Sequence, residues 1–225
     1  SLVAFGPKQR ALGEAAKTQE TSNFRDTVGS LKRLIGRTLN DLEVQEYEKK
    51  FLNAKLVDVN GTFCVQVNYV GEPHTFSATQ LTAMYLNKLK DIASVELKTG
   101  VSDIVIAIPG WFTEIQRRAM LDAAAIADLN CLRLINDYAA VALGYGITKA
   151  DLPEPENPRH VVFVDVGLSA SVVAFSKGQL VVKGTGLDAH LGGREIDYAL
   201  VRHFSEFKTK HKIDVMSNPK ATFRL

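Results

Sequence analysis

Asp165 and Gly167 lie in the turn Asp165-Val166-Gly167-Leu168-Ser169, which follows the apolar segment HVVFV. A carboxylate at the end of a strand can hold a hydrated metal ion, while the backbone amides of a glycine-containing turn face a phosphate. The same Asp-x-Gly sequence occurs in hairpins in which the aspartate side chain only closes the turn. The segment therefore predicts either a phosphate-binding turn or an ordinary hairpin.

Gly192 and Gly193 follow a short predicted hairpin and precede a predicted helix. Glycine allows a close approach of the backbone, and the N–H groups at a helix N-terminus attract phosphate. The alternative is a glycine-rich helix start that binds no ligand.

Asp137 and Lys17 have structural interpretations. Asp137 ends an apolar segment and could be the N-cap of the following helix, which is the safer interpretation. Lys17, in GEAAKTQE, is one lysine among many, and a solvated surface lysine is its default interpretation. The histidines show no metal-ligand spacing, and Cys64 and Cys131 form no CxxC pair, so we expect reduced thiols and no direct metal site.

Composition favours a globular protein that binds neither nucleic acid nor membrane. The chain has 225 residues, 46% of them apolar, which suffices for a core. Its 27 Lys and Arg nearly balance 25 Asp and Glu, which leaves no strong field for nucleic acid or anionic lipid. No targeting segment is visible, and the apolar stretch 119–129 is interrupted by Asp122 and Asp128. We therefore expect a soluble protein.

The elements that must position these residues can be predicted from local patterns. Residues 1–76 indicate a small α+β lobe with a strand at 2–5, a helix at 27–35 and an alternating strand at 62–70. Capping boxes at Ser77 and Thr113 predict the starts of two helices.

The following segments indicate α/β architecture. The apolar segments 103–109 and 131–136 predict buried parallel strands under covering helices. An exposed proline-rich connection at 149–160 leads to three strands that form an antiparallel meander, and a helix over 192–212 gathers basic residues at its C-terminal end.

Several segments together resemble the 70-kilodalton heat-shock chaperones in their amino-acid sequence, their order and their spacing. They are LGEAAKTQ, LKRLIGR, IPGWFTEIQRRAMLDAAAIADLN, LRLIND followed by AAVALGYG, FVDVG and HLGGREIDYAL. Four features are closer to the 110-kilodalton branch, in a fungal form. They are Trp111, the lack of a three-glycine turn after Asp165, and the segments YGITKADLP and FKTKHKIDVMSNPKATFRL.

This resemblance implies an actin-like (ribonuclease H-like) ATPase fold, in which two lobes enclose ATP and magnesium. Residues 1–76 would be the outer part of the first lobe, 77–155 its inner part, and 156–225 the start of the second lobe. The family's first phosphate turn would precede Ser1 and its adenosine pocket would follow Leu225, so the fold would be incomplete. We therefore expect this chain alone to bind ATP weakly or not at all.

The resemblance also assigns site residues. The positions that would contact the nucleotide are Lys17, Asp165, Gly167, Leu168, Ser169 and Gly193. Asp137 would stand where the family usually has a glutamate, and Asp137 and Asp165 would hold magnesium through water. A residual ATPase would depend on Lys17, Asp137 and Asp165.

The function implied by the resemblance is that of a cytosolic, ATP-binding chaperone in the stress response. It would accelerate nucleotide exchange on 70-kilodalton partners and hold unfolded polypeptides. The alternatives are a phosphoryl-transferring kinase of the same fold, for which the sequence shows no catalytic base, and a structural fragment that binds no nucleotide.

Overall fold

The structure, a computed structural model, describes residues 1–167, 169–205 and 218–224. The chain divides into two compact units, which are described separately. Unit 1 comprises Ser1–Ile104, Thr113–Leu132 and Lys212–Leu225, and unit 2 comprises Val105–Phe112 and Arg133–His211. The three-part division into 1–76, 77–155 and 156–225 concerns lobes of a larger fold and stays a prediction.

Unit 1 begins with a small antiparallel sheet. Strand β1 (Val3–Phe5) lies between β2 (Arg10–Leu12) and β3 (Thr27–Val28). The connection from β2 to β3 contains helix α1 (Glu14–Lys17) and the 3₁₀ helix η1 (Phe24–Asp26). The strand predicted at 2–5 is confirmed.

The single helix predicted at 27–35 is wrong. Residues 27 and 28 form β3, because Val28 pairs with Val3, and helix α2 spans only Leu31–Leu34. Ser30 before α2 has a φ of 56°, a left-handed conformation that interrupts any continuous helix.

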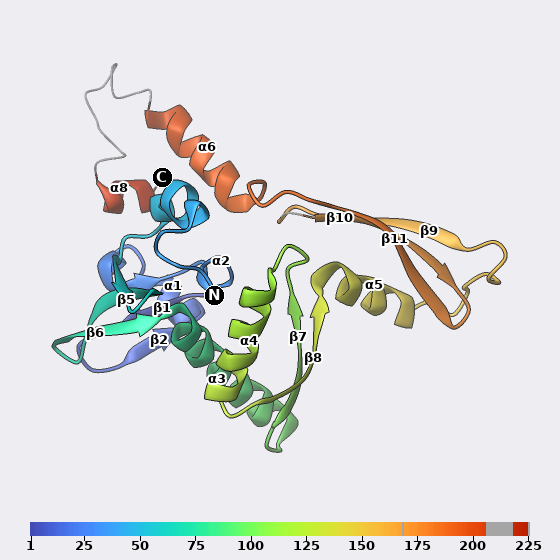
Figure 1. Cartoon of the computed structure of the whole chain (residues 1–225), viewed down its shortest axis with the longest axis horizontal. Helices are drawn as coiled ribbons and strands as arrows, with labels where there is room; N and C mark the ends of the chain where they lie inside the picture. Colours follow the sequence, from blue (N-terminus) through green and yellow to red (C-terminus); the bar gives the residue numbers. More distant parts are fainter. Residues whose placement is uncertain (168, 206–217, 225) are drawn as a thin grey trace. The chain divides into compact units, whose positions relative to one another are not determined.

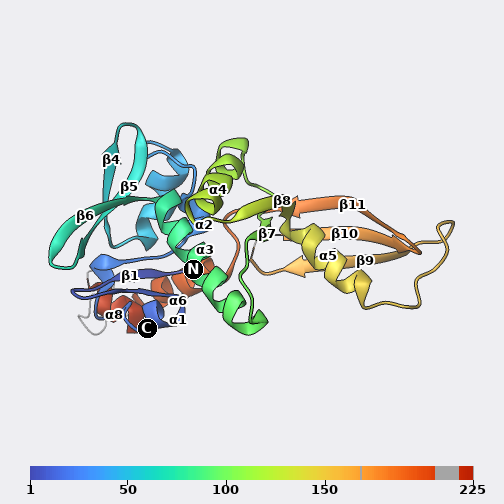
Figure 2. The same cartoon turned by 90° about the horizontal axis from the view of Figure 1, so that it is seen from below.

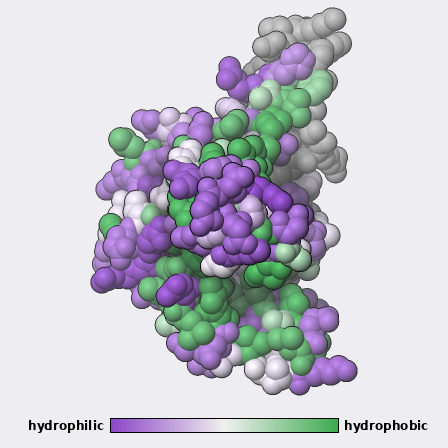
Figure 3. All heavy atoms as spheres, turned by 90° about the vertical axis from the view of Figure 1, so that its right-hand side faces the viewer, coloured by the Kyte–Doolittle hydropathy of each residue, from purple (hydrophilic) through white to green (hydrophobic). Residues whose placement is uncertain are grey.

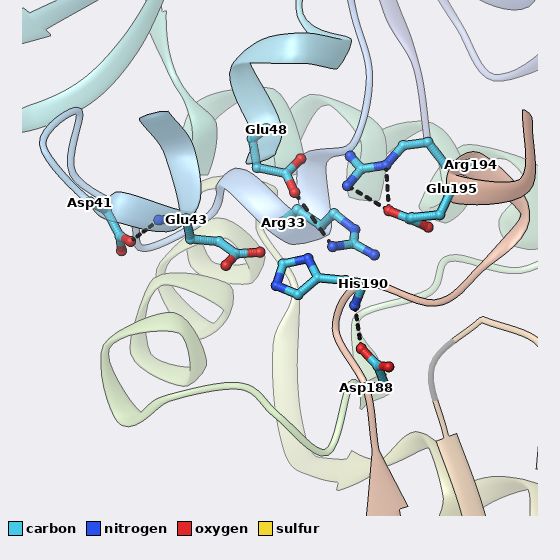
Figure 4. Close-up of polar contacts among 8 residues, drawn as sticks. All are labelled: Arg33, Asp41, Glu43, Glu48, Asp188, His190, Arg194 and Glu195. Carbon is cyan, nitrogen blue, oxygen red and sulfur yellow. Dashed lines mark hydrogen bonds and ion pairs between the residues drawn. The ribbon is translucent and has the colours of Figure 1, made fainter. Parts of the chain in front are cut away.

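A buried ion pair connects α2 to the next helical segments, the π-helix η2 (Glu43–Tyr47) and the 3₁₀ helix η3 (Glu48–Phe51). Arg33 Nη1 of α2 lies 3.4 Å from Glu48 Oε1, and both side chains are buried (Figure 4). A buried carboxylate is costly without a countercharge, so this pair specifies how the short helices pack.

The second sheet of unit 1 has the order β4 (Lys55–Val59), β5 (Thr62–Tyr69) and β6 (Glu72–Ser77), all antiparallel. Phe63, Val65 and Val67 of β5 are buried in the core, as the alternating pattern predicted. Cys64 is buried as well, and burial raises the pKa of its thiol.

Two helices of unit 1, α3 (Ala78–Leu97) and α4 (Glu114–Ile126), begin with the predicted capping boxes. Gln80 N donates to Ser77 Oγ at 3.1 Å, and Gln116 N donates to Thr113 Oγ1 at 3.3 Å. In each case the glutamine side chain returns a bond to the cap residue, which satisfies two donors that a helix N-terminus leaves free. Both helix starts are confirmed.

Strands β7 (Asp103–Ile108) and β8 (Asn130–Asn136) pair in a sheet of two strands. Their arrows point the same way in Figure 1, so the predicted parallel pairing is confirmed. The predicted burial is wrong, since Val105 is 57% exposed and Leu132 is 63% exposed. A sheet of two strands shields few of its own side chains.

Unit 2 is built on the antiparallel sheet β11-β10-β9, the predicted meander. Its strands are β9 (Arg159–Asp165), β10 (Ser169–Ser176) and β11 (Gln179–Leu187). Helix α5 (Asp137–Ile147) lies along this sheet in both ribbon views (Figures 1 and 2). Its Tyr145 ring contacts the rings of Phe163 and Phe175, with centroids 5.5 Å and 5.2 Å away.

The connection between α5 and β9 is irregular and largely exposed, as predicted for the proline-rich segment. Lys177 N donates to Pro153 O at 2.9 Å, and Arg159 binds Asp151 at 3.1 Å. This hydrogen bond from Arg159 lowers the pKa of the Asp151 carboxyl. Figure 3 faces this end of the unit, and the atoms nearest the viewer are mostly hydrophilic.

Helix α6 (Gly193–Ser205) confirms the start of the helix predicted at 192–212, and Arg202 and His203 lie in its last turn. The basic residues predicted at 207–212 lie outside the described residues. A short helix, α8 (Pro219–Arg224), ends the described chain. No helix within the described ranges is long and apolar enough to cross a bilayer.

The two hairpins of the β4-β5-β6 sheet lead to a prediction about stability. Asn60 and Gly61 connect β4 to β5, Val70 and Gly71 connect β5 to β6, and all four have positive φ. Valine is strained in this conformation by about 1 to 2 kcal/mol, whereas asparagine tolerates it. Val70→Asn should therefore stabilise the chain by about 1 kcal/mol, because Val70 is 55% exposed and loses little packing.

The reciprocal change Asn60→Val is the matched control and should destabilise by a similar amount. Urea unfolding followed by circular dichroism measures both variants. A loss of stability in Val70→Asn would show that the valine makes a contact worth more than the strain.

The connection between α5 and β9 predicts where a protease cuts first. Trypsin should cut after Lys149 and an endoproteinase specific for glutamate after Glu156, because both bonds lie in exposed, irregular chain. Mass spectrometry of early digestion products identifies the sites. First cleavage inside 103–146 would contradict this order of local stability.

Candidate functional site

The Asp165 turn lies between the first two strands of the meander. Asp165 ends β9, Ser169 begins β10, and the two residues are paired across the hairpin. The Asp165 side chain lies against Gly167, where an added Cβ would be 3.2 Å from Asp165 Oδ1. A larger residue at 167 would therefore displace the carboxylate. Leu168, the fourth residue of the predicted turn, lies outside the described residues.

The Asp165 carboxylate is exposed and makes no hydrogen bond or ion pair with any described residue. Leu168 N, a donor that could close the turn onto this carboxylate, lies outside the described residues, so both interpretations of the turn stay predictions. An exposed carboxylate is what a phosphate turn needs of its aspartate.

Asp137 is not the N-cap of α5, and that prediction is wrong. Asn136 occupies the cap position, with φ −67° and ψ 140°, and Asp137 is the first helical residue. Asp137 Oδ1 accepts a hydrogen bond of 2.7 Å from Tyr138 N, and its charge suits the positive end of the helix dipole. The helix thus presents a carboxylate at its N-terminus.

The loop after β7 brings Asp137 and the Asp165 turn to the same end of unit 2. A Cβ on Gly110 would lie 2.8 Å from Tyr138 Cε1 and 3.4 Å from Leu187 Cδ1. Leu187 pairs with Ser169, which pairs with Asp165 on the other side of β10.

Gly110 is thus a positioning residue that sequence reasoning missed. Its signal was the Pro-Gly pair after an apolar strand, which marks a turn. A substitution at 110 would force the Tyr138 ring to move.

Gly193 is the first residue of α6, and Ile196 N donates to Gly192 O at 3.1 Å. Apart from its chain neighbours and the backbone of its own helix, no described atom lies within 4 Å of the position that a Cβ would take on Gly193. Packing against other described parts of the chain therefore does not require glycine at 193.

Polar contacts order the chain around the start of α6. Asp188 Oδ1 accepts from His190 N at 2.8 Å, and Arg194 binds Glu195 Oε1 through Nε and Nη2 at 3.1 Å and 3.0 Å (Figure 4). The approach to the helix is therefore specified by local bonds.

Lys17 belongs to unit 1, where it lies at the C-terminal end of α1, whereas the other candidate residues described above belong to unit 2. Its side chain is 62% exposed and pairs with Glu20. This geometry is that of a solvated surface lysine, and a role toward phosphate stays a prediction.

Two carboxylates of unit 2 could serve a hydrated cation. Asp165 is exposed and has no bond to a described residue, and Asp137 stands in the first turn of α5. No group of three His, Cys, Asp or Glu side chains in the described part of the chain could hold a metal directly.

Comparison with known proteins identifies relatives along the whole chain. The family model "Hsp70 protein" matches residues 1–225. The chain is 55% identical over its full length to "Heat shock protein hsp88" of Neurospora crassa, covering 32% of that protein. It is 50% identical to a heat shock protein homolog of Candida glabrata and 48% identical to one of Saccharomyces cerevisiae, covering all of this chain and 33% of each relative.

The chain thus spans about a third of the length of the curated relatives it matches. The match confirms the predicted resemblance to the 70-kilodalton heat-shock chaperones, and these relatives confirm its fungal, 110-kilodalton form. The mixed α/β architecture with several small sheets agrees with the predicted actin-like fold class. The chain belongs to the Hsp70 family.

Proposed function

We propose that the chain is part of a cytoplasmic, ATP-binding chaperone that accelerates nucleotide exchange on 70-kilodalton heat-shock chaperones and holds unfolded polypeptides. The observation that carries this proposal is the 48–55% identity over the entire chain to proteins named as heat shock proteins. The kinase alternative is not supported, because these relatives are named as heat shock proteins and the sequence shows no catalytic base.

The nucleotide site of this proposal uses the residues assigned from the resemblance. The backbone and side chains that would hold the phosphates are those of Lys17, Gly167, Leu168, Ser169 and Gly193. Asp137 and Asp165 would hold magnesium through water. Magnesium, when bound, neutralises phosphate charge, and this chain supplies the carboxylates that position its water shell.

The proposed mechanism is conformational. A ligand held between two lobes shifts the population toward one relative arrangement of the lobes, and only that arrangement binds the partner. Binding then matters more for function than hydrolysis, and a residual ATPase from Lys17, Asp137 and Asp165 is secondary.

Thermal unfolding of the full-length parent tests the function directly. Magnesium-ATP at about 100 times its Kd should stabilise the protein by about 2.7 kcal/mol, because it binds only the folded state. Candidate sugars added to ATP should give no further shift. A further shift with a sugar would favour the kinase, and no shift with ATP would contradict nucleotide binding.

The roles of Asp165 and Lys17 can be separated in the same parent. Asp165→Asn should weaken magnesium-ATP binding about tenfold or more, because hydrogen bonds to charged groups contribute about 1.5 to 3 kcal/mol. Nucleotide exchange on the partner should fall with it near the Kd and recover at saturating ATP. Lys17→Met should leave exchange nearly intact while it removes residual hydrolysis.

Calorimetry and the exchange rate on a 70-kilodalton partner measure both effects, with the exposed Lys88→Met as the matched control. If Lys17→Met abolished exchange while Asp165→Asn retained it, the assigned roles would be reversed. The claim that binding rather than turnover drives function would then fail.

A further inference from the structure

A cavity of about 300 Å³ lies in unit 1, within Ser1–Ile104, and none of the residues assigned to the nucleotide lines it. Its lining comes from η1, the approach to β4, and all three strands of the β4-β5-β6 sheet. The lining residues are Arg25, Asp26, Asn53, Lys55, Gln66, Val67, Asn68 and Pro73. Six of these eight residues have polar or charged side chains.

The sheet register explains why polar side chains from different strands meet here. Lys55 of β4 pairs with Gln66 of β5, and Asn68 of β5 pairs with Pro73 of β6. Gln66 and Asn68 are two positions apart, so both lie on the same face of β5. The opposite face carries the buried Phe63, Val65 and Val67.

Asp26 is the acidic residue of the cavity, and its carboxylate is already engaged. Asp26 Oδ1 accepts from Asn68 N at 2.7 Å and lies 3.4 Å from Asn68 Nδ2. These contacts hold η1 against β5.

The two basic residues of the cavity have no acidic partner among the described residues. Neither Arg25 nor Lys55 makes an ion pair or side-chain hydrogen bond there, although the Arg25 guanidinium lies 5.7 Å from the Phe24 ring centroid. The side chains of Asn53 and Gln66 are likewise unpaired within the described chain.

We propose that this cavity binds an acidic polypeptide segment, with a carboxylate of the segment held by Arg25 and Lys55. A guanidinium binds a carboxylate through paired N–H donors, and an ammonium adds charge. Asn53 and Gln66 each offer a donor and an acceptor, the combination that a peptide group requires. The inference does not rest on the proposed function, because no nucleotide residue takes part.

The probe is the peptide acetyl-Gly-Gly-Glu-Gly-Glu-Gly-Gly-amide, with its glutamine analogue as the matched control. Titration into the ¹⁵N-labelled 225-residue chain is followed by NMR. The amide of Asn68 is the reporter, because its N–H donates to Asp26 inside the cavity. The glutamate peptide should shift this amide and its cavity neighbours, and the glutamine peptide should bind at least about threefold more weakly.

Three variants test the assignment of charge. Arg25→Gln and Lys55→Gln should each weaken binding of the glutamate peptide about three- to fivefold, the upper range for an exposed ion pair. Asp26→Asn should strengthen it, because a repelling charge is removed while the amide oxygen still accepts from Asn68 N. The exposed Lys88→Gln, on α3 and outside the cavity, is the control and should change nothing.

The proposal is overturned if the glutamate and glutamine peptides bind equally, or if Lys88→Gln weakens binding as much as Lys55→Gln. Inorganic phosphate is titrated separately. If it shifts the same amides at the same concentrations as the peptide does, the cavity is a general anion site and the peptide proposal fails. Because ATP is absent from every arm, the outcome is independent of the proposed chaperone activity.

Discussion

The arrangement of unit 2 depends on the contact between Phe175 of β10 and the C-terminal half of α5. A Cβ on Gly146 would lie 3.2 Å from Phe175 Cε1, so glycine at this position allows the helix to approach the ring closely. Tyr145 adds contacts with Phe163 and Phe175, and Ala142, Val173 and Phe175 form the buried cluster between helix and sheet. Burial of such side chains contributes about 1.5 to 3 kcal/mol each. The direction of α5 over the sheet follows from this contact.

That direction decides what lies at the two ends of the sheet. The C-terminal end of α5 lies over the aromatic cluster, so its N-terminus, with Asp137, extends toward the end where β9 and β11 finish at Asp165 and Leu187. Gly110 completes this end by its fit against Tyr138 and Leu187. Two carboxylates and a helix N-terminus are thus gathered by apolar packing at a distance from them. Apolar packing at one end of the sheet stabilises the unit, so the polar end can remain exposed without loss of the fold. A ligand site requires such an exposed end.

The parts of this fold that the sequence predicted well depend on a few neighbouring residues. Both capping boxes need only a cap residue and a glutamine three positions later. The predictions that were wrong concern residues whose structure depends on partners distant in sequence. Residues 27 and 28 become a strand because Val3 is there to pair with Val28, and the apolar composition of β7 and β8 did not reveal that Val105 and Leu132 are exposed. Asp137 was assigned as a cap one residue too far along the chain, a boundary error to which local patterns are prone. The cavity of η1 and β5 joins Asp26 to Asn68 and could not be predicted from either segment alone.

The two hairpins of the β4-β5-β6 sheet in unit 1 also show strand pairing imposing a backbone conformation that a residue does not prefer. Both are two-residue connections with positive φ at each central position, yet one uses Asn60 and the other Val70. The pairing of Tyr69 with Glu72 fixes the length of the second loop, and Val70 N donates to Gly6 O at 3.2 Å. Val67, buried just before the turn, prevents a shift of register, because a slip of one residue would move it and Val65 to the solvent face. Register, loop length and one hydrogen bond therefore impose on a β-branched residue a conformation that it would not adopt by itself. The turn is specified by its surroundings rather than by its own sequence.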